Sequence, residues 1–102
     1  MERKEIEKNN VKLLGTVISE GVHSHDVYGE SFYFYDLSVK RTSENADIIP
    51  VLISNRLVNL NDIKVGSHIM VEGQVRSYNK FENDRNKLIL SVFPLSLTFV
   101  SD

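Results

Sequence analysis

The chain has 102 residues, of which 41% are apolar and 25% charged, and its formal net charge is −2. This size and composition indicate one domain with a single modest core. The absence of cysteine excludes disulfide frameworks, thiolate zinc sites and cysteine nucleophiles. No apolar run approaches the ~20 residues that cross a bilayer, and no signal segment opens the chain. We therefore expect a cytoplasmic protein without a membrane partner, and not a dedicated binder of duplex DNA, which is usually strongly basic.

The first part of the chain predicts a tail, a strand and a loop. Residues 1–10 are polar and charged almost throughout and predict a frayed tail or a short helical turn, so we place the domain at residues 11–102. Residues 11–20 are apolar on both alternating faces, so one face can line a core while the other meets a second subunit. Residues 21–30 are polar and predict a loop.

Two further strands are predicted at residues 31–41 and 47–55, joined by a hairpin at 42–46. Alternation along the first of them places two sets of side chains on opposite faces. One set is Tyr33, Tyr35, Leu37 and Val39, and the other is Phe32, Phe34, Asp36, Ser38 and Lys40. The set with Leu37 ends more apolar, so we assign it inward. Pro50, which has no N–H, indicates an irregular or edge position in the following strand.

The second half of the chain completes an all-β pattern. Residues 56–64 predict a short helix or a capped loop, and residues 67–78 a fourth strand in which Gly73 marks a bulge or tight bend. Residues 79–87 predict a polar loop, and residues 88–100 a last strand interrupted at Pro94. Five strands, with a short helical link between the third and fourth, predict a five-stranded Greek-key OB-fold barrel.

Four stretches, in order along the chain, resemble the bacterial single-stranded DNA-binding protein family. NNVKLLG (residues 9–15) is similar to its first strand, YDLSVKR (35–41) to its second, and DIIPVLISNRL (47–57) to its third strand and the start of its helix. The most specific match is KVGSHIMVEGQVRSY (64–78), similar to the family's Gly-Ser/Asp-x-x-x-Val-Glu-Gly-x-x-Arg core. The resemblance implies an OB-fold, binding to single-stranded DNA and assembly through the first strand.

The chain also departs from that family. The link at residues 56–64 is shorter than the family's helical connection, Ser54 stands where an aromatic residue is frequent, and tryptophan is absent. The sequence ends at Asp102, directly after the last predicted strand. We therefore expect a tail-less relative, either one similar to the primosomal replication protein with the same barrel or a version from a mobile element.

Binding a single strand needs cations for the phosphates and aromatic faces for the bases, and each stacked base contributes ~1–3 kcal/mol. Phe32 and Phe34 are candidate stacking platforms, with Lys40 and Arg41 at the end of their strand; the alternative is that both phenylalanines are core residues. Arg56 is a further phosphate candidate. A second candidate region interleaves aromatic and basic residues, although an ordinary solvated hairpin would have a similar composition. Its members are Arg76, Tyr78, Lys80, Phe81, Arg85 and Lys87.

The segment His23-Ser24-His25-Asp26 has too few convergent ligands for a zinc site, although its histidines could touch a phosphate when protonated. No nucleophile elbow, phosphate-binding glycine loop or paired-carboxylate motif is present, and Glu72 has no acidic or histidine partner near it in sequence. We expect no metal, no cofactor and no catalysis.

The sequence thus predicts a sequence-tolerant single-stranded DNA-binding protein accessory to replication, restart, repair or recombination. We expect a homodimer or homotetramer whose interface is formed by Val11, Leu13, Leu14, Thr16 and Ile18. The alternative is an OB-fold module of the primosome type that contacts other replication proteins and binds nucleic acid weakly or not at all. The acidic balance, the missing tryptophan and Ser54 favour this alternative. Binding to RNA is a third hypothesis, because base stacking does not distinguish the sugars.

Overall fold

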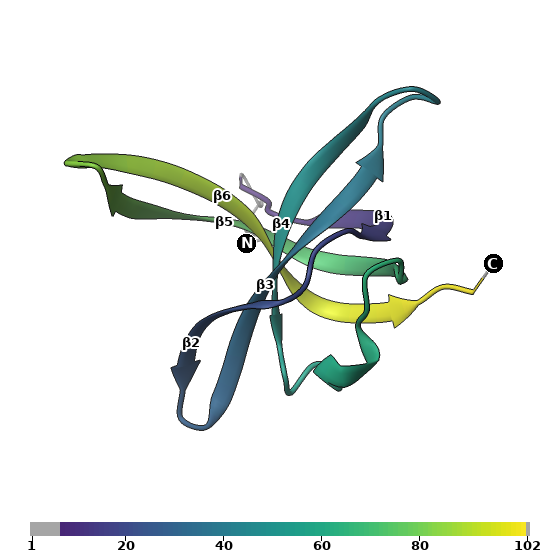
Figure 1. Ribbon diagram of the computed structural model, residues 1–102, viewed down its shortest axis with the longest axis horizontal. Helices are drawn as coiled ribbons and strands as arrows, with labels where there is room; N and C mark the ends of the chain where they lie inside the picture. The colour runs from purple at the N-terminus through teal and green to yellow at the C-terminus, as the bar shows by residue number, and fades with distance from the viewer. Residues whose placement is uncertain (1–6, 102) are drawn as a thin grey trace, which may run out of the picture.

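The computed structural model describes residues 7–101 and consists almost entirely of strands (Figure 1). The elements in chain order are β1 (Val11–Val17), β2 (Val22–Val27), β3 (Glu30–Lys40), β4 (Ala46–Ser54), the 3₁₀ turn η1 (Leu60–Asp62), β5 (His68–Glu82) and β6 (Arg85–Phe99). The strands pair in the order β1-β5-β6-β4-β3-β2, and β1 also pairs with β3, which closes the ring. The predicted OB-fold barrel is confirmed. Most of the expected N-terminal tail, residues 1–6, lies outside the described residues.

Strand β2 is an element that the sequence analysis assigned to a loop. It pairs with the first half of β3, while β1 pairs with β3 further along, at Thr16 and Val17. All six residues of β2 are exposed, and a bulge separates His23 from His25. Because neither face of β2 is buried, its sequence carries no apolar alternation, and the strand was not predicted.

The barrel core is built from alternate residues of the strands. Leu37 and Tyr35 of β3 are 1% and 6% exposed, which confirms that this face of β3 points inward. The remaining buried members of the core come from the other barrel strands and from the segment after η1. They are Val17, Val51, Ile53, Ile63, Ile69, Val71 and Val92.

The link between β4 and β5 contains only the single turn η1. The Asn59 side chain accepts a hydrogen bond from the Asn61 N–H at 3.0 Å and so caps the turn. Ile63 directly after the turn is buried in the core, and Leu57 and Leu60 are half-buried against it. The sequence predicted either a short helix or a capped loop for this link. The capped loop describes it best, because the only regular element described in it is the three-residue turn η1. Among the described residues, no helix has the length and apolarity to span a bilayer.

A bulge lies where β5 and β6 cross the barrel. Their register shifts between Glu72 and Gly73, and Gly73 lies opposite Pro94. A Cβ atom on Gly73 would lie 2.1 Å from the carbonyl oxygen of Phe93, so this approach of the two backbones requires glycine. The predicted structural role of Gly73 is confirmed, and β6 continues through Pro94 because the bulge accommodates it.

Beyond the bulge, β5 and β6 continue as a long hairpin that projects from the barrel (Figure 1). We call residues 75–92 the β5–β6 arm. The prediction of a loop at residues 79–87 is wrong, because β5 runs to Glu82 and β6 begins at Arg85. Asn83 and Asp84 alone form the turn, with φ of 53° and 61°. Two successive positive φ angles are typical of the tight turns that match strand twist, and asparagine and aspartate tolerate them.

Candidate nucleic-acid interface

Aromatic rings and one guanidinium group form a continuous row on the outside of the barrel. The His25 and Phe32 rings stack with centroids 4.7 Å apart, and Phe32 lies 6.0 Å from Phe93. The Arg76 guanidinium carbon lies 4.2 Å from the centroid of the Phe93 ring. We call this row, together with the neighbouring pair Phe34 and Tyr78, the aromatic–basic face; it comprises His25, Phe32, Phe34, Arg76, Tyr78 and Phe93.

Strand register brings these residues together from four different strands. Phe32 and Phe34 alternate with the core residues of β3 and therefore point outward. His25 of β2 lies directly opposite Phe32, and Phe93 of β6 lies opposite Gln74, two residues before Arg76. The face thus joins segments of the chain that are far apart in sequence.

A cleft of about 290 Å³ opens between Phe34, Tyr78 and Phe93. The Phe34 and Tyr78 rings lie 5.8 Å apart with an interplanar angle of 26°. Phe34 is half-buried and Tyr78 is 40% exposed, so both rings retain surface in contact with solvent. Flat aromatic surfaces beside a cation are what a splayed-out base requires.

The expectation that Phe32 is a stacking platform needs correction. Phe32 does lie on the outer side of β3, outside the core cluster, but it is only 7% exposed. His25 stacks on its ring and Phe93 packs beside it, so no free face remains for a base. Phe32 instead supports the rings that surround it.

Arg76 presents its guanidinium group on the aromatic–basic face. Its guanidinium group lies over Phe93 and donates a hydrogen bond to Gln74 Oε1 at 3.1 Å. Within residues 7–101 no carboxylate pairs with it. A planar guanidinium held flat on a ring keeps further N–H donors free for an anion.

The β5–β6 arm has two chemically different faces. Residues that lie directly opposite in an antiparallel pair share a face, and the pairs Tyr78–Ile89 and Lys80–Lys87 therefore extend the aromatic–basic face. Lys80 also lies 3.8 Å from Glu82, which itself lies opposite Arg85. The other face carries large exposed apolar side chains, each of the outer three lying opposite a small polar residue (Ser77, Asn79 or Asn86). We call it the apolar face of the arm: its exposed apolar members are Val75, Phe81, Leu88 and Leu90, which are 39%, 70%, 62% and 57% exposed. Phe81 is thus separated from the residues with which the sequence analysis grouped it.

Two predicted cations, Lys40 and Arg41, lie away from this face. Lys40 is six residues beyond Phe34, or ~20 Å along the strand. The Arg41 guanidinium donates two hydrogen bonds to the Asp47 carboxylate, and the one from Nε measures 3.2 Å. These hydrogen bonds raise the pKa of Arg41 and lower the pKa of Asp47. The charge of Arg41 is therefore largely offset.

Arg56 is also close to a carboxylate. Its guanidinium lies 3.9 Å from Glu30 Oε1 and donates a hydrogen bond to the Tyr28 carbonyl at 3.3 Å. Glu30 in turn accepts a hydrogen bond from the buried Ser54 hydroxyl. Ser54, which departs from the family pattern, thus fixes this acidic corner and does not leave an open gap.

The two histidines of β2 have different surroundings. His23 donates a hydrogen bond to Asp26 at 3.0 Å, and this bond, followed by one from Ser31, lowers the pKa of Asp26. His25 stacks on Phe32 and borders the cleft. Among the described residues, no three His, Cys, Asp or Glu side chains are grouped closely enough to hold a metal ion.

Sequence reasoning missed Phe93 and did not place His25 on the aromatic–basic face. Phe93 is out of phase with Leu88, Leu90 and Val92, and it lies opposite Gln74 on the polar side of β5. That phase was visible in the sequence and could have marked Phe93 as an outward aromatic. No such signal existed for His25, because β2 itself was not predicted.

The closed barrel with an aromatic and cationic outer face places this chain among the OB-fold proteins. Two solved structures share the fold at low identity. The small single-stranded DNA-binding protein of Streptomyces coelicolor aligns with a TM-score of 0.72 and 12% identity over 93% of this chain and 96% of that one. The SSB of Plasmodium falciparum, solved in complex with single-stranded DNA, aligns with a TM-score of 0.75 and 17% identity over 97% of this chain and 100% of that one.

A third solved structure is also similar in sequence. The N-terminal domain of the PriB protein from Thermoanaerobacter tencongensis, whose structure is dimeric, is 42% identical over 94% of this chain and 100% of that one, with a TM-score of 0.80. The chain therefore belongs to the PriB family of SSB-like OB-fold proteins. No family model and no curated protein matches the sequence.

Proposed function

We propose that this chain is a single-stranded DNA-binding protein of the PriB type that serves DNA replication and runs no chemistry of its own. Bases stack on Phe34 and Tyr78 in the cleft, and Arg76 contacts the phosphates. The observation that carries the proposal is the cleft itself, in which a stacked aromatic pair lies beside a cation that is paired with no carboxylate of residues 7–101. Such a site is tolerant of sequence because every base has a π-face.

The arm extends the proposed path of the strand. Lys87 lies opposite Lys80 on the same face as Tyr78, so it can neutralise a further phosphate, whereas the ion pair with Glu82 reduces the contribution of Lys80. Arg85 lies at the arm tip beside Glu82 and contributes less. The carboxylates beside Arg41 and Arg56 likewise assign those two residues a minor role, and Lys40 lies beyond the main path.

The proposed assembly is a homodimer. Strand β3 pairs with β1 only at Thr16 and Val17, so within residues 7–101 the earlier part of β1 has one unpaired side. An open strand edge favours pairing with another strand. Leu14 on β1 is 56% exposed, and the T. tencongensis PriB domain, at 42% identity, is dimeric.

The apolar face of the arm adds surface to this interface. At its base lies an apolar cleft of about 210 Å³, lined in part by Val11 and Leu13 of β1 and by Val75 and Leu90 of the arm. Val11 and Leu13 pack partly against the core, so they would meet a partner only through this cleft. Leu14, Thr16 and Ile18 complete the proposed interface.

The test is fluorescence anisotropy with labelled single-stranded DNA, RNA and duplex DNA of equal length, at low and high salt. We expect single-stranded DNA to bind most tightly, with an affinity that falls as salt releases counterions. Phe34→Ala should weaken binding to poly-dT about fivefold or more, because ~1–3 kcal/mol of stacking is lost. If the variant binds as tightly as the wild type, the cleft is not the binding site. If the protein binds none of the three nucleic acids, the proposed function is wrong.

A cytoplasmic location follows from this function.

A further inference from the structure

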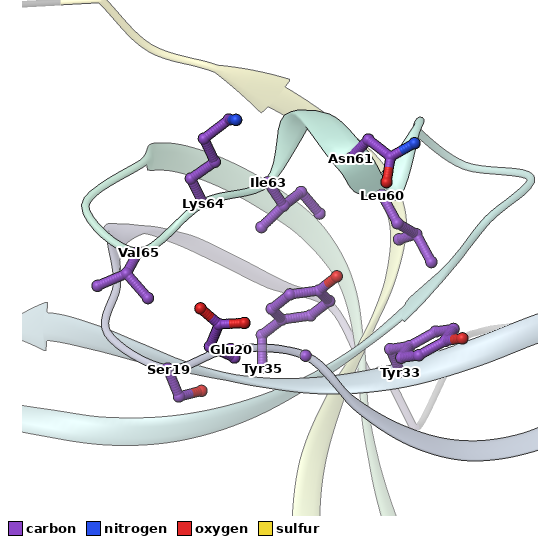
Figure 2. A pocket seen from close by; sticks show the side chains of 10 residues that line it. Ser19, Glu20, Tyr33, Tyr35, Leu60, Asn61, Ile63, Lys64 and Val65 are labelled. Atoms are coloured by element: carbon purple, nitrogen blue, oxygen red, sulfur yellow. The ribbon is translucent and has the colours of Figure 1, made fainter.

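A second pocket, of about 640 Å³, lies at one end of the barrel (Figure 2). Its walls are the β1–β2 connection, Tyr33 and Tyr35 of β3, and the segment from Leu60 to Val65. The two tyrosines alternate with Phe32 and Phe34 along β3, so their side chains leave the opposite side of the strand from the aromatic–basic face. The pocket is therefore separate from the proposed path of DNA.

The Tyr35 residue is largely buried, with only 6% of its surface exposed. Its hydroxyl oxygen makes no hydrogen bond to a protein group within residues 7–101. The oxygen is not sealed from solvent but borders the pocket. A Cβ atom on Gly21 would lie 2.8 Å from this oxygen, so a glycine is needed for the phenol to lie beneath the chain there. Because this oxygen opens onto the pocket, it is available to a ligand as a hydrogen-bonding group.

The electrostatic character of the pocket is negative around Tyr35. The Glu20 carboxylate lies next to the Tyr35 ring (Figure 2), and within the described part of the chain no cation pairs with it. Burial, and then the neighbouring Tyr33 and Glu20, raise the pKa of Tyr35. The ammonium group of Lys64, also at the rim, points away from Tyr35. The inner wall is apolar, with Ile63 buried and Leu60 half-buried.

We propose that this pocket receives a lysine or arginine side chain of a partner protein. The aliphatic stem would lie on Leu60 and Ile63, and the cation would meet the Glu20 carboxylate and the oxygen and ring face of Tyr35. A DNA phosphate fits poorly, because Glu20 repels it. The inference goes beyond the proposed function and does not depend on it, since none of these residues belongs to the aromatic–basic face.

The experiment is a titration of the ¹⁵N-labelled full chain, followed by amide NMR, with the capped peptide acetyl-Gly-Lys-Gly-amide. Parallel titrations use its arginine and norleucine analogues, the latter being a neutral side chain of similar length to lysine, and an oligo-dT. We expect saturable shifts at Gly21, Asn61 and Lys64 with the lysine and arginine peptides. The norleucine peptide should bind about fivefold more weakly, as expected for one exposed charge pair.

Two variants with exposed side chains complete the test. Glu20→Gln keeps the size of the side chain and removes its charge. This variant should therefore bind the lysine and norleucine peptides with equal affinity. Lys64→Gln is the matched control at the same rim and should preserve or strengthen the preference for lysine over norleucine. The proposal would be overturned if the lysine and arginine peptides cause no amide shifts, or if the norleucine peptide binds as tightly as they do. An unchanged preference for lysine over norleucine in Glu20→Gln would overturn it as well. Movement of the same amides by oligo-dT would overturn it too, by assigning the pocket to nucleic acid.

Discussion

The two faces of the β5–β6 arm arise from alternate residues of the same two strands, yet their chemistry is opposite. One carries Arg76, Tyr78, Lys80 and Lys87, and the other is apolar and open to solvent. Ser91 and Val92 at the base of the arm are buried, and Val92 belongs to the barrel core. The outer part of the hairpin, beyond these two residues, lies outside that core. One hairpin can therefore present two surfaces of different chemistry, and under the proposed function we assign DNA to one face and a second subunit to the other.

The largest effect should come from reversing the charge of Arg76, which lines the cleft. Arg76→Glu should weaken binding to a short oligo-dT about tenfold or more, because a charge-assisted hydrogen bond to phosphate contributes ~1.5–3 kcal/mol. The salt dependence should also flatten by ~0.7, the slope of one phosphate contact. Anisotropy titrations at several salt concentrations measure both, and an unaltered slope would mean that Arg76 contacts no phosphate.

The second prediction introduces a charge on the apolar face of the arm, where it should weaken the dimer and not DNA binding. Leu88→Asp should raise the dissociation constant of the dimer about tenfold, because a carboxylate would be buried against a partner without a counter-charge. Sedimentation equilibrium measures the constant. Binding of a short oligo-dT by one protomer should be preserved, and a dimer of wild-type strength would refute the assignment of this face.

A pair of aromatic substitutions compares the faces directly. Tyr78→Ala should weaken binding of a short oligo-dT about fivefold through lost stacking, whereas Phe81→Ala should leave it unchanged. The two residues lie three positions apart on β5 and face opposite ways. If both variants lose affinity equally, the strand wraps around the arm and the two-face assignment fails.

The smallest effect is expected at Lys87, next to Leu88 but on the other face. Lys87→Gln should reduce affinity for oligo-dT about twofold, as for an exposed charge contact, while the dimer constant stays the same. The affinity comes from anisotropy and the dimer constant from sedimentation. A change in the dimer constant with no change in affinity would exchange the roles of the two faces.

Several features were predictable because they depend on neighbours in sequence. The inward face of β3 follows from the alternation around Leu37, and the bulge from the glycine at position 73, where no side chain fits. The aromatic and basic character of residues 76–87 was also visible. The accessibility of the aromatic rings could not be predicted in the same way. Phe32, for example, is covered by His25 and Phe93, which lie on two other strands.

The sequence alone determined the barrel and the chemical types available on its surface, since a period of two and the residues at each position are local properties. The tertiary structure decided the rest: that β2 is a strand, that Phe81 and Tyr78 lie on opposite faces of the arm, and that Arg76 lies on Phe93. The physical reason is register. Alternation states which residues share a face of one strand, but only the hydrogen-bonded pairing of distant strands decides which of those faces meet and which stay open.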